Sequence, residues 1–187
     1  QTRSESSFEL FGDLNLEDKL VLDVGCGMGS NIKYLYACGA RVVVAFDIDL
    51  CQLRNTRAAF VDSVQTCLLA ANAEWMPFRN DVFDVLVATD TFEHLRDVEA
   101  VLRECYRVLR PGGELLLYYP PFYAPWGAHM VNWIRVPWCQ VFFSESTIMR
   151  VARRLELEGS ATNNLLPPET RLDLQDGETI PFVNHLT

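Results

Sequence analysis

A glycine-rich turn directly follows the first apolar run of the chain, in Val21-Leu22-Asp23-Val24-Gly25-Cys26-Gly27-Met28-Gly29. Glycines let a backbone turn sharply and approach a ligand closely, and the helix that follows presents free N–H groups. The G-x-G-x-G spacing differs from the G-x-G-x-x-G of dinucleotide sites. Asp23 precedes the first glycine by two positions, where a carboxylate would repel a pyrophosphate but suits a cationic amino group. The pattern indicates a site for a ligand with an amino group, and a plain strand-to-helix turn is the structural alternative.

The segments around this turn alternate between short apolar runs and helical periods. Continuous apolar strands separated by amphipathic helices indicate parallel β-α units, with helices on both faces of the sheet. We therefore predict an α/β fold with a doubly wound, mostly parallel sheet. The expected strands are 20–24, 41–46, 64–70, 82–88 and 114–119, and the expected helices are 30–38, 50–60, 98–109 and 145–157.

Ligands of such sheets bind beyond the carboxyl ends of the strands, beside the first strand. The loops expected to gather at that edge are 25–29, 47–49, 71–75 and 89–94. Asp47 ends the second expected strand, and a carboxylate accepts two hydrogen bonds at once. Helix capping is the structural alternative for this acidic loop, and it describes Asp49 better than Asp47.

The clearest helical period covers residues 98–109 and stops at Pro111-Gly112-Gly113. Its apolar side chains are expected on one stripe and its charged side chains on the opposite face. The stripe comprises Val98, Val101, Leu102, Cys105, Tyr106 and Leu109, and the charged face comprises Arg96, Glu99, Arg103, Glu104, Arg107 and Arg110. In the helix expected at 145–157, the apolar side is Ile148, Val151, Ala152 and Leu155.

Further motifs follow the glycine-rich turn in a fixed order. They are Ala71-Asn72-Ala73-Glu74-Trp75-Met76-Pro77-Phe78, Phe83-Asp84-Val85-Leu86, Glu93-His94-Leu95-x-Asp97 and Leu109-Arg110-Pro111-Gly112-Gly113. Over roughly Leu20 to Tyr119, the sequence closely resembles the class I S-adenosylmethionine-dependent methyltransferases. The resemblance implies a Rossmann-like methyltransferase fold, with S-adenosyl-L-methionine as cofactor and S-adenosyl-L-homocysteine as product.

The resemblance also implies roles for individual residues. Asp47 matches the acidic residue that holds the two ribose hydroxyls, and the loop at Asn72 contacts adenine. Asn72 replaces the usual aspartate, but its amide oxygen can still accept from the adenine amino group. We expect no metal. The cofactor-binding residues expected are Asp23, Gly25, Cys26, Gly27, Gly29, Asp47, Ile48, Asn72, Ala73, Glu74 and Thr89.

Methyl transfer asks little of the protein beyond aligning a nucleophile and excluding water. A hydroxyl nucleophile would need a base, and the candidate bases are His129 and His94. For His94 the alternative is a histidine that only braces its loop. Tyr119 and Tyr123 are further options at the end of the fifth expected strand.

A Trp- and Pro-rich insertion, Phe122 to Phe143, follows the fifth expected strand. Its aromatic side chains could form a lid over an apolar substrate, pack the insertion onto the core, or form a surface for a membrane or a second subunit. Tyr119-Pro120-Pro121-Phe122 resembles the [ND]-P-P-[FY] motif of enzymes that methylate amide or base nitrogens. That motif belongs after the fourth strand and begins with Asn or Asp, so methylation of nucleic-acid adenine is disfavoured.

The composition of the chain limits which classes of partner it is expected to bind. The 187 residues carry 25 acidic and 16 basic side chains, and this balance disfavours nonspecific nucleic-acid binding. No C-x-x-C pair and no long uncharged apolar stretch occurs, so we expect a cytoplasmic protein without stable membrane insertion. We predict a single methyltransferase domain over 1–187, with a cofactor-binding core at 14–119 and an insertion, lid and C-terminal segment at 120–187. The acceptor expected is a small, apolar or lipid-like molecule.

The family fold has seven strands, the last two in an antiparallel hairpin beside the fifth. The residues after Tyr119 are mostly insertion or loop, so the hairpin looks incomplete and the sequence is expected to be part of a longer chain. A homodimer could otherwise cover the exposed edge. Two other functions stay open: an inactive methyltransferase-like module that binds cofactor or a partner, and a nicotinamide oxidoreductase.

Overall fold

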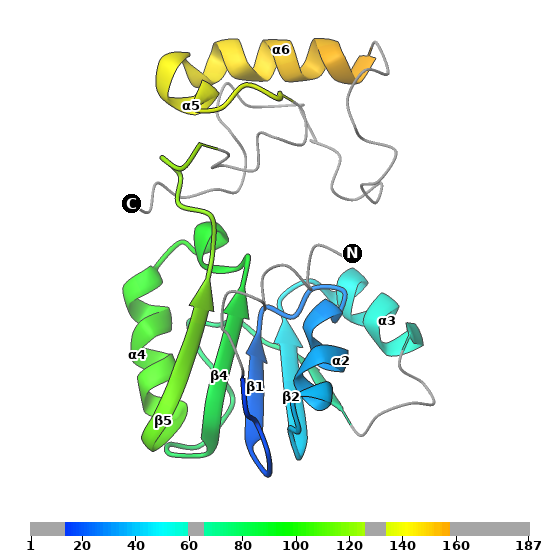
Figure 1. Cartoon of the computed structure of the whole chain (residues 1–187), viewed down its shortest axis with the longest axis vertical. Helices are drawn as coiled ribbons and strands as arrows, with labels where there is room; N and C mark the ends of the chain where they lie inside the picture. Colours follow the sequence, from blue (N-terminus) through cyan, green and yellow to red (C-terminus); the bar gives the residue numbers. More distant parts are fainter. Residues whose placement is uncertain (1–13, 60–65, 126–133, 158–187) are drawn as a thin grey trace. The chain divides into compact units, whose positions relative to one another are not determined.

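A computed structural model describes residues 14–59, 66–125 and 134–157 (Figure 1). The chain divides into two compact units. The first comprises Gln1–Phe92 and Arg96–Tyr118, and the second comprises Glu93–Leu95 and Tyr119–Thr187. The expectation of a single domain stays a prediction.

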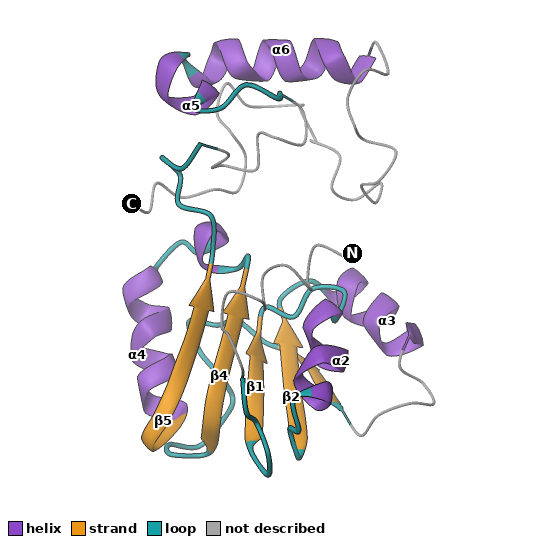
Figure 2. Cartoon of the chain, viewed as in Figure 1, coloured by secondary structure: helices purple, strands orange, loops and turns teal. Residues whose placement is uncertain are grey.

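The first unit is built on one five-stranded sheet (Figure 2). Its order is β3-β2-β1-β4-β5, and each neighbouring pair of strands is parallel. The chain winds outward from β1 to one edge and then crosses to the other side, which confirms the doubly wound α/β fold. The strands are β1 (Leu20–Val24), β2 (Val42–Asp47), β3 (Cys67–Ala70), β4 (Phe83–Thr89) and β5 (Leu109–Tyr118).

Helices α2 (Ser30–Ala37), α3 (Leu50–Ala59) and α4 (Val98–Val108) connect the strands. The two central strands are almost wholly buried, as expected for a parallel sheet covered on both faces. Their side chains pack with those of α2 and β2 in the main core. That core includes Val21, Ile32, Leu35, Val43, Val85 and Val87.

The fifth strand begins at Leu109 rather than at the expected Glu114, and α4 ends one residue earlier, at Val108. The reason lies in the pairing with β4. Leu109 pairs with Phe83 and Glu114 pairs with Val85, so the Pro-Gly-Gly segment forms an irregularity inside the strand rather than a turn before it. β3 begins at Cys67, three residues after the expected start, and residues 64 and 65 lie outside the described residues.

The apolar stripe of α4 also differs from the expected one. Val101, Cys105 and Val108 are buried, whereas Leu102 is exposed and Tyr106 is 85% exposed. Val101 and Cys105 lie on the expected stripe, but the buried face extends from them toward Val108 rather than toward Leu102 and Tyr106. The shift turns Glu104 and Arg107 toward the protein, where both are half-buried.

In the second unit, α5 (Cys139–Phe142) and α6 (Glu145–Leu157) share a small core of Phe122, Ile134, Cys139, Ile148 and Ala152. Gln140 Nε2 donates to the carbonyls of Phe122 and Ala124 at 2.8 and 2.7 Å and so ties α5 to the chain after β5. Met149 is buried in α6 in place of the expected Val151, which is exposed.

Exposure separates the aromatic side chains of the insertion. Phe122 is buried in the small core of the second unit, and packing of the insertion onto the core of the first unit stays a prediction. Trp138 and Phe143 are exposed and Phe142 is 73% exposed, so packing does not account for these three. Trp126 and Trp133 lie outside the described residues. Within the ranges that the structure describes, no helix combines the length and apolar character needed to cross a membrane.

Candidate functional site

The loops after β1 and β2 meet at the carboxyl edge of the sheet, as the sequence predicts. The N–H of Gly27 donates to Asp47 Oδ2 at 2.8 Å, and the N–H of Cys26 donates to the carbonyl of Phe46 at 2.9 Å. The N–H of Asp49 donates to Asp47 Oδ1, also at 2.8 Å. Each carboxylate oxygen of Asp47 keeps a lone pair after these bonds. Asp47 can therefore accept from a pair of ligand hydroxyls while it holds the glycine-rich turn.

Asp49 acts as the cap of α3, as predicted. Its Oδ1 accepts from the N–H groups of Cys51 and Gln52 at 2.8 and 3.4 Å. The two acidic residues of this loop thus have separate roles. Asp49 accepts hydrogen bonds from the first N–H groups of α3, and Asp47 joins the loop after β1 to the loop after β2.

The Gly27 peptide is also held through its carbonyl. The fully buried hydroxyl of Thr56 on α3 lies 2.9 Å from that carbonyl and 3.0 Å from the carbonyl of Gln52. A Cβ at Gly27, whose φ is +50°, would come within 3.0 Å of Gln52 Oε1. Gly27 thus combines a left-handed backbone with a close approach to the end of the Gln52 side chain, and Thr56 holds its peptide in this position.

Thr91, two residues after β4, closes the other side of the turn. Its hydroxyl lies 3.1 Å from the carbonyls of both Val24 and Thr89 and 3.4 Å from that of Gly25. Gly25 has a φ of +70°, and a Cβ there would lie 2.5 Å from Thr91 Cγ2. The ends of β1 and β4 are thereby joined, and residue 25 must be a glycine.

We expect Gly25→Ala to lower the free energy of unfolding by about 3 kcal/mol, because a strained left-handed backbone adds to an overpacked contact. Gly112→Ala is the matched control: its φ is +79°, but a Cβ there meets nothing within 4 Å. The control should lose only about 1 kcal/mol. Urea unfolding measures both. Adding Thr91→Ser to Gly25→Ala should recover part of the loss, and equal losses at the two glycines would contradict the steric argument.

Asp23 lies at the end of β1, fully buried. Its Oδ1 accepts from Asn31 Nδ2 at 3.2 Å, and the same nitrogen donates to Thr89 Oγ1 at 2.8 Å. Its Oδ2 is buried and has no hydrogen-bond partner among the described residues. Such an acceptor is costly to leave unpaired, so it marks a place for a donor that the protein itself does not supply.

Electrostatics at this edge favour a cation. Burial raises the pKa of the Asp23 carboxyl to about 7, the hydrogen bond from Asn31 lowers it, and the nearby Asp47 charge raises it again. Burial, followed by the charges of Asp23 and Asp47, also raises the pKa of the Cys26 thiol far above its ordinary value. Cys26 is therefore an uncharged thiol, unsuited to nucleophilic work, and a ligand ammonium would offset the two carboxylates.

The loop after β3 is the third segment at this edge of the sheet, after the loops that follow β1 and β2. The N–H of Ala71 donates to the carbonyl of Asp47 at 3.0 Å, which places the start of this loop beside the acidic loop. Asn72 closes a turn: its Oδ1 accepts from the N–H of Glu74 at 2.9 Å and its carbonyl accepts from that of Trp75 at 3.0 Å. Ala73 is buried, whereas Trp75 is 79% exposed. The amide oxygen of Asn72 keeps one lone pair for a ligand.

Ile48, which follows Asp47, is 73% exposed. An exposed apolar side chain at this place can contact the flat face of a ligand ring.

The two candidate bases are placed differently. His94 is exposed and belongs to the second unit, with its Nε2 at 3.8 Å from Glu93 Oε1. His129 lies outside the described residues. The described ranges contain no group of three or more His, Cys, Asp or Glu side chains arranged to hold a metal ion.

Most of the expected site residues thus come together in the first unit, at the ends of β1, β2, β3 and β4. Sequence reasoning missed three residues that hold this edge in place: Asn31, Thr56 and Thr91. A signal existed for Asn31 and Thr56, since each is a polar residue at a helix position that faces inward. For Thr91 the signal was its place two residues after a buried strand, opposite the first glycine.

Comparisons with known proteins agree with this geometry. A family model described as a methyltransferase domain matches residues 22–117. The sterol 4-C-methyltransferase of Caenorhabditis elegans is 30% identical over 99 residues, which are 52% of this chain and 30% of that protein. The sarcosine/dimethylglycine N-methyltransferase of Halorhodospira halochloris is 35% identical over 109 residues, which are 55% of this chain and 38% of that protein.

A solved S-adenosylmethionine-dependent methyltransferase from Mesorhizobium loti shares the fold. It has a TM-score of 0.56 and 23% identity, and the match covers 63% of this chain and 55% of that one. The chain spans about a third of the length of the two curated relatives, at 30% and 38%.

Proposed function

The chain belongs to the class I S-adenosylmethionine-dependent methyltransferases, and we propose that the carboxyl edge of its sheet binds S-adenosyl-L-methionine for methyl transfer to a small-molecule acceptor. The observation that carries the proposal is the buried Oδ2 of Asp23, which lies beside a glycine-rich turn and has no hydrogen-bond partner in the described part of the chain. A nicotinamide dinucleotide would bring a pyrophosphate to these two carboxylates, whereas S-adenosyl-L-methionine would bring an ammonium.

The residues of the edge fit the parts of the cofactor. Asp23 would accept from the ammonium, and the peptides of Gly25 to Gly29, Cys26 included, would lie along the methionine part. Asp47 would accept from the ribose hydroxyls. Ile48, together with the turn of Asn72, Ala73 and Glu74, would hold the adenine. Thr89 would act beside Asp23 through Asn31, to which both are hydrogen-bonded.

When bound, the cofactor supplies a methyl group that is already electrophilic, so this chain need only bind, orient and exclude water. A carbon or amine nucleophile needs orientation alone, and a hydroxyl acceptor needs a group that takes its proton. We propose His129 or His94 for that proton. His129→Ala and His94→Ala, assayed with a hydroxyl acceptor, would show loss of turnover with unchanged cofactor affinity for whichever is the base.

The acceptor proposed is small and apolar or lipid-like. The relatives act, by their names, on a sterol in one case and on sarcosine or dimethylglycine in the other, so family membership alone leaves the acceptor open. The exposed aromatic side chains Trp138, Phe142 and Phe143 support an apolar one, since exposed apolar groups gathered in one segment are typical of a surface that binds an apolar ligand or a partner. Their role as a lid, and a homodimer at the β5 edge, stay predictions.

Calorimetry with S-adenosyl-L-homocysteine, followed by methyl-transfer assays over sterol, quinol, amine and amino-acid acceptors, tests the proposal. We expect binding, and turnover with at least one apolar acceptor. Binding without turnover on the whole panel would favour the inactive module. Tighter binding of NADH than of S-adenosyl-L-homocysteine would favour the oxidoreductase and overturn the proposal.

A further inference from the structure

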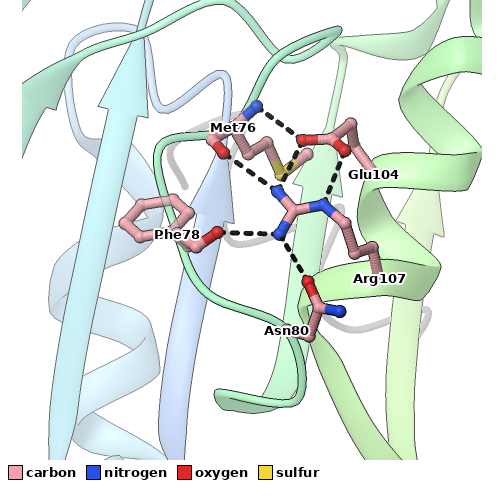
Figure 3. A network of polar contacts seen from close by, with 5 residues as sticks. All are labelled: Met76, Phe78, Asn80, Glu104 and Arg107. Carbon is pink, nitrogen blue, oxygen red and sulfur yellow. Dashed lines mark hydrogen bonds and ion pairs between the residues drawn. The ribbon is translucent and has the colours of Figure 1, made fainter.

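Arg107 on α4 uses all of its N–H groups within the first unit (Figure 3). Its Nε and Nη2 donate to the two carboxylate oxygens of Glu104, each at 2.7 Å. Its Nη1 donates to the carbonyl of Phe78 at 2.7 Å and to Asn80 Oδ1 at 3.0 Å, and its Nη2 donates to the carbonyl of Met76 at 3.0 Å. A planar guanidinium with five satisfied donors has one orientation, so Arg107 is a rigid bracket.

Glu104 completes the bracket from the other side. Its Oε2 accepts from the N–H of Met76 at 2.7 Å, so the pair holds both the N–H and the C=O of one loop residue. The hydrogen bond from Arg107 lowers the pKa of Glu104, and the one to Glu104 raises the pKa of Arg107, so both stay charged at neutral pH. We call Glu104 and Arg107 the loop clamp.

The clamped segment directly follows the turn at Asn72–Trp75. At its start, this turn is tied to the acidic loop through the bond from Ala71 to Asp47. At its end, Met76 is buried and held by the loop clamp. The ring of Phe78 packs edge-on against that of Phe83, with the two ring centroids 4.9 Å apart. The turn between is held at both ends as well as by its own hydrogen bonds at Asn72, and Trp75 within it is largely exposed.

We propose that the loop clamp is a positioning device that sets the affinity of this site for the adenosine part of the cofactor. The inference rests on the proposed function. Neither clamp residue touches the ligand; both act through the loop. Without the bracket, the turn would sample other conformations, and apparent affinity falls in proportion to the fraction of molecules whose turn is in the binding conformation.

The same helix carries a matched control pair. Arg103 donates to Glu99 at 2.6 Å, and both side chains lie exposed on α4. Removing Arg103 deletes a helix-surface ion pair of the same chemical type without touching the loop. Val101, fully buried on α4, gives a second control, because Val101→Ala destabilises the helix packing and also leaves the loop untouched.

The test compares Arg107→Ala, Arg107→Lys and Glu104→Gln with Arg103→Ala and Val101→Ala. We expect Arg107→Ala to weaken binding of both S-adenosyl-L-homocysteine and free adenosine by about 10-fold to 100-fold, by the same factor for each. Arg107→Lys should lose nearly as much, since an ammonium cannot replace the fork. In the ligand-free protein, hydrogen exchange at the Met76 amide should speed up in the clamp variants alone.

Three results would overturn the inference. The first is unchanged adenosine affinity in Arg107→Ala. The second is that Val101→Ala loses as much affinity, for a given loss of thermal stability, as the clamp variants lose. The weaker binding would then follow from general destabilisation of the protein. The third is failure of the unsubstituted protein to bind S-adenosyl-L-homocysteine at all, which would overturn the proposed function and this inference with it.

Discussion

Asp23→Asn should make the ligand-free protein more stable above pH 7 and abolish binding of S-adenosyl-L-homocysteine. The stabilisation follows from burial. Asp23 is fully buried, and its carboxyl has a pKa of about 7 in the fold against 3.8 in a solvated chain. Each pKa unit corresponds to about 1.4 kcal/mol, so the charged carboxylate lowers stability by roughly 4 kcal/mol at pH 8.

The sign of the pH dependence follows from proton binding. The folded protein holds the Asp23 proton more tightly than the unfolded chain does, so the contribution of Asp23 to stability falls as the pH rises from about 4 to about 7. Above pH 7 the contribution stays constant. An asparagine does not titrate. The difference in unfolding free energy between Asp23→Asn and the unsubstituted protein should therefore grow by about 3 kcal/mol between pH 5 and pH 8.

Urea unfolding at pH 5, 6, 7 and 8 measures this difference. Comparing its change across pH removes any constant effect of the new amide, whose N–H groups need acceptors. Asp49→Asn is the matched control, because it removes a charge from the same edge while asparagine still caps α3. Its stability difference should stay flat over this range. A flat difference for Asp23→Asn would show that Asp23 is ionised without penalty.

Ligand binding should show the opposite dependence. An ammonium pairs with the ionised carboxylate, so the affinity for S-adenosyl-L-homocysteine should rise about tenfold per pH unit below 7 and level off above it. Adenosine, which lacks the ammonium, should bind with no such slope. An equal slope for adenosine would place the titrating group elsewhere. Together these results would mean that Asp23 lowers the stability of the empty fold so that the bound state gains an ion pair.

The sheet and the edge where the site forms could be predicted because each depends on local patterns. Apolar runs of about five residues specify buried parallel strands, and the carboxyl ends of parallel strands must share one edge. Asp47 and Asp49 were separable on sequence alone, since a capping residue sits immediately before its helix. The glycine-rich turn was likewise predictable, because it directly follows the first apolar run of the chain.

What sequence reasoning missed depends on contacts between distant segments. The hydrogen bonds of Asn31 to Asp23 and Thr89 join α2, β1 and β4. The helical period of α2 could place Asn31 on the inward face, but it could not identify partners on two distant strands. Arg107 was expected on the charged face because the expected stripe extended from Val101 and Cys105 toward Leu102 and Tyr106, whereas the buried face extends toward Val108. The start of β5 was missed because a Pro-Gly-Gly segment normally ends an element, whereas here its irregular pairing with β4 keeps it in the strand.

Asp47→Ala should weaken binding of S-adenosyl-L-homocysteine by about 100-fold or more. A bond to a charged acceptor contributes about 1.5–3 kcal/mol, and the substitution removes the acceptor for both ribose hydroxyls. It also leaves the N–H groups of Gly27 and Asp49 without their acceptor, which frees the glycine-rich turn on one side. Calorimetry measures the affinity. Asp49→Ala, which removes only the cap of α3, should lose about 1 kcal/mol of stability and bind within about threefold of the unsubstituted protein.

A ligand without one hydroxyl separates the two effects of Asp47. If Asp47 holds the ribose, the unsubstituted protein should bind the 2′-deoxy analogue of S-adenosyl-L-homocysteine at least about tenfold more weakly than the parent, and Asp47→Ala should not distinguish the two. If Asp47 only ties the loops together, both proteins would discriminate equally. Because the same two oxygens bond to Gly27 and Asp49, the first outcome would mean that ribose is recognised by a carboxylate whose position the two loops fix before the ligand arrives.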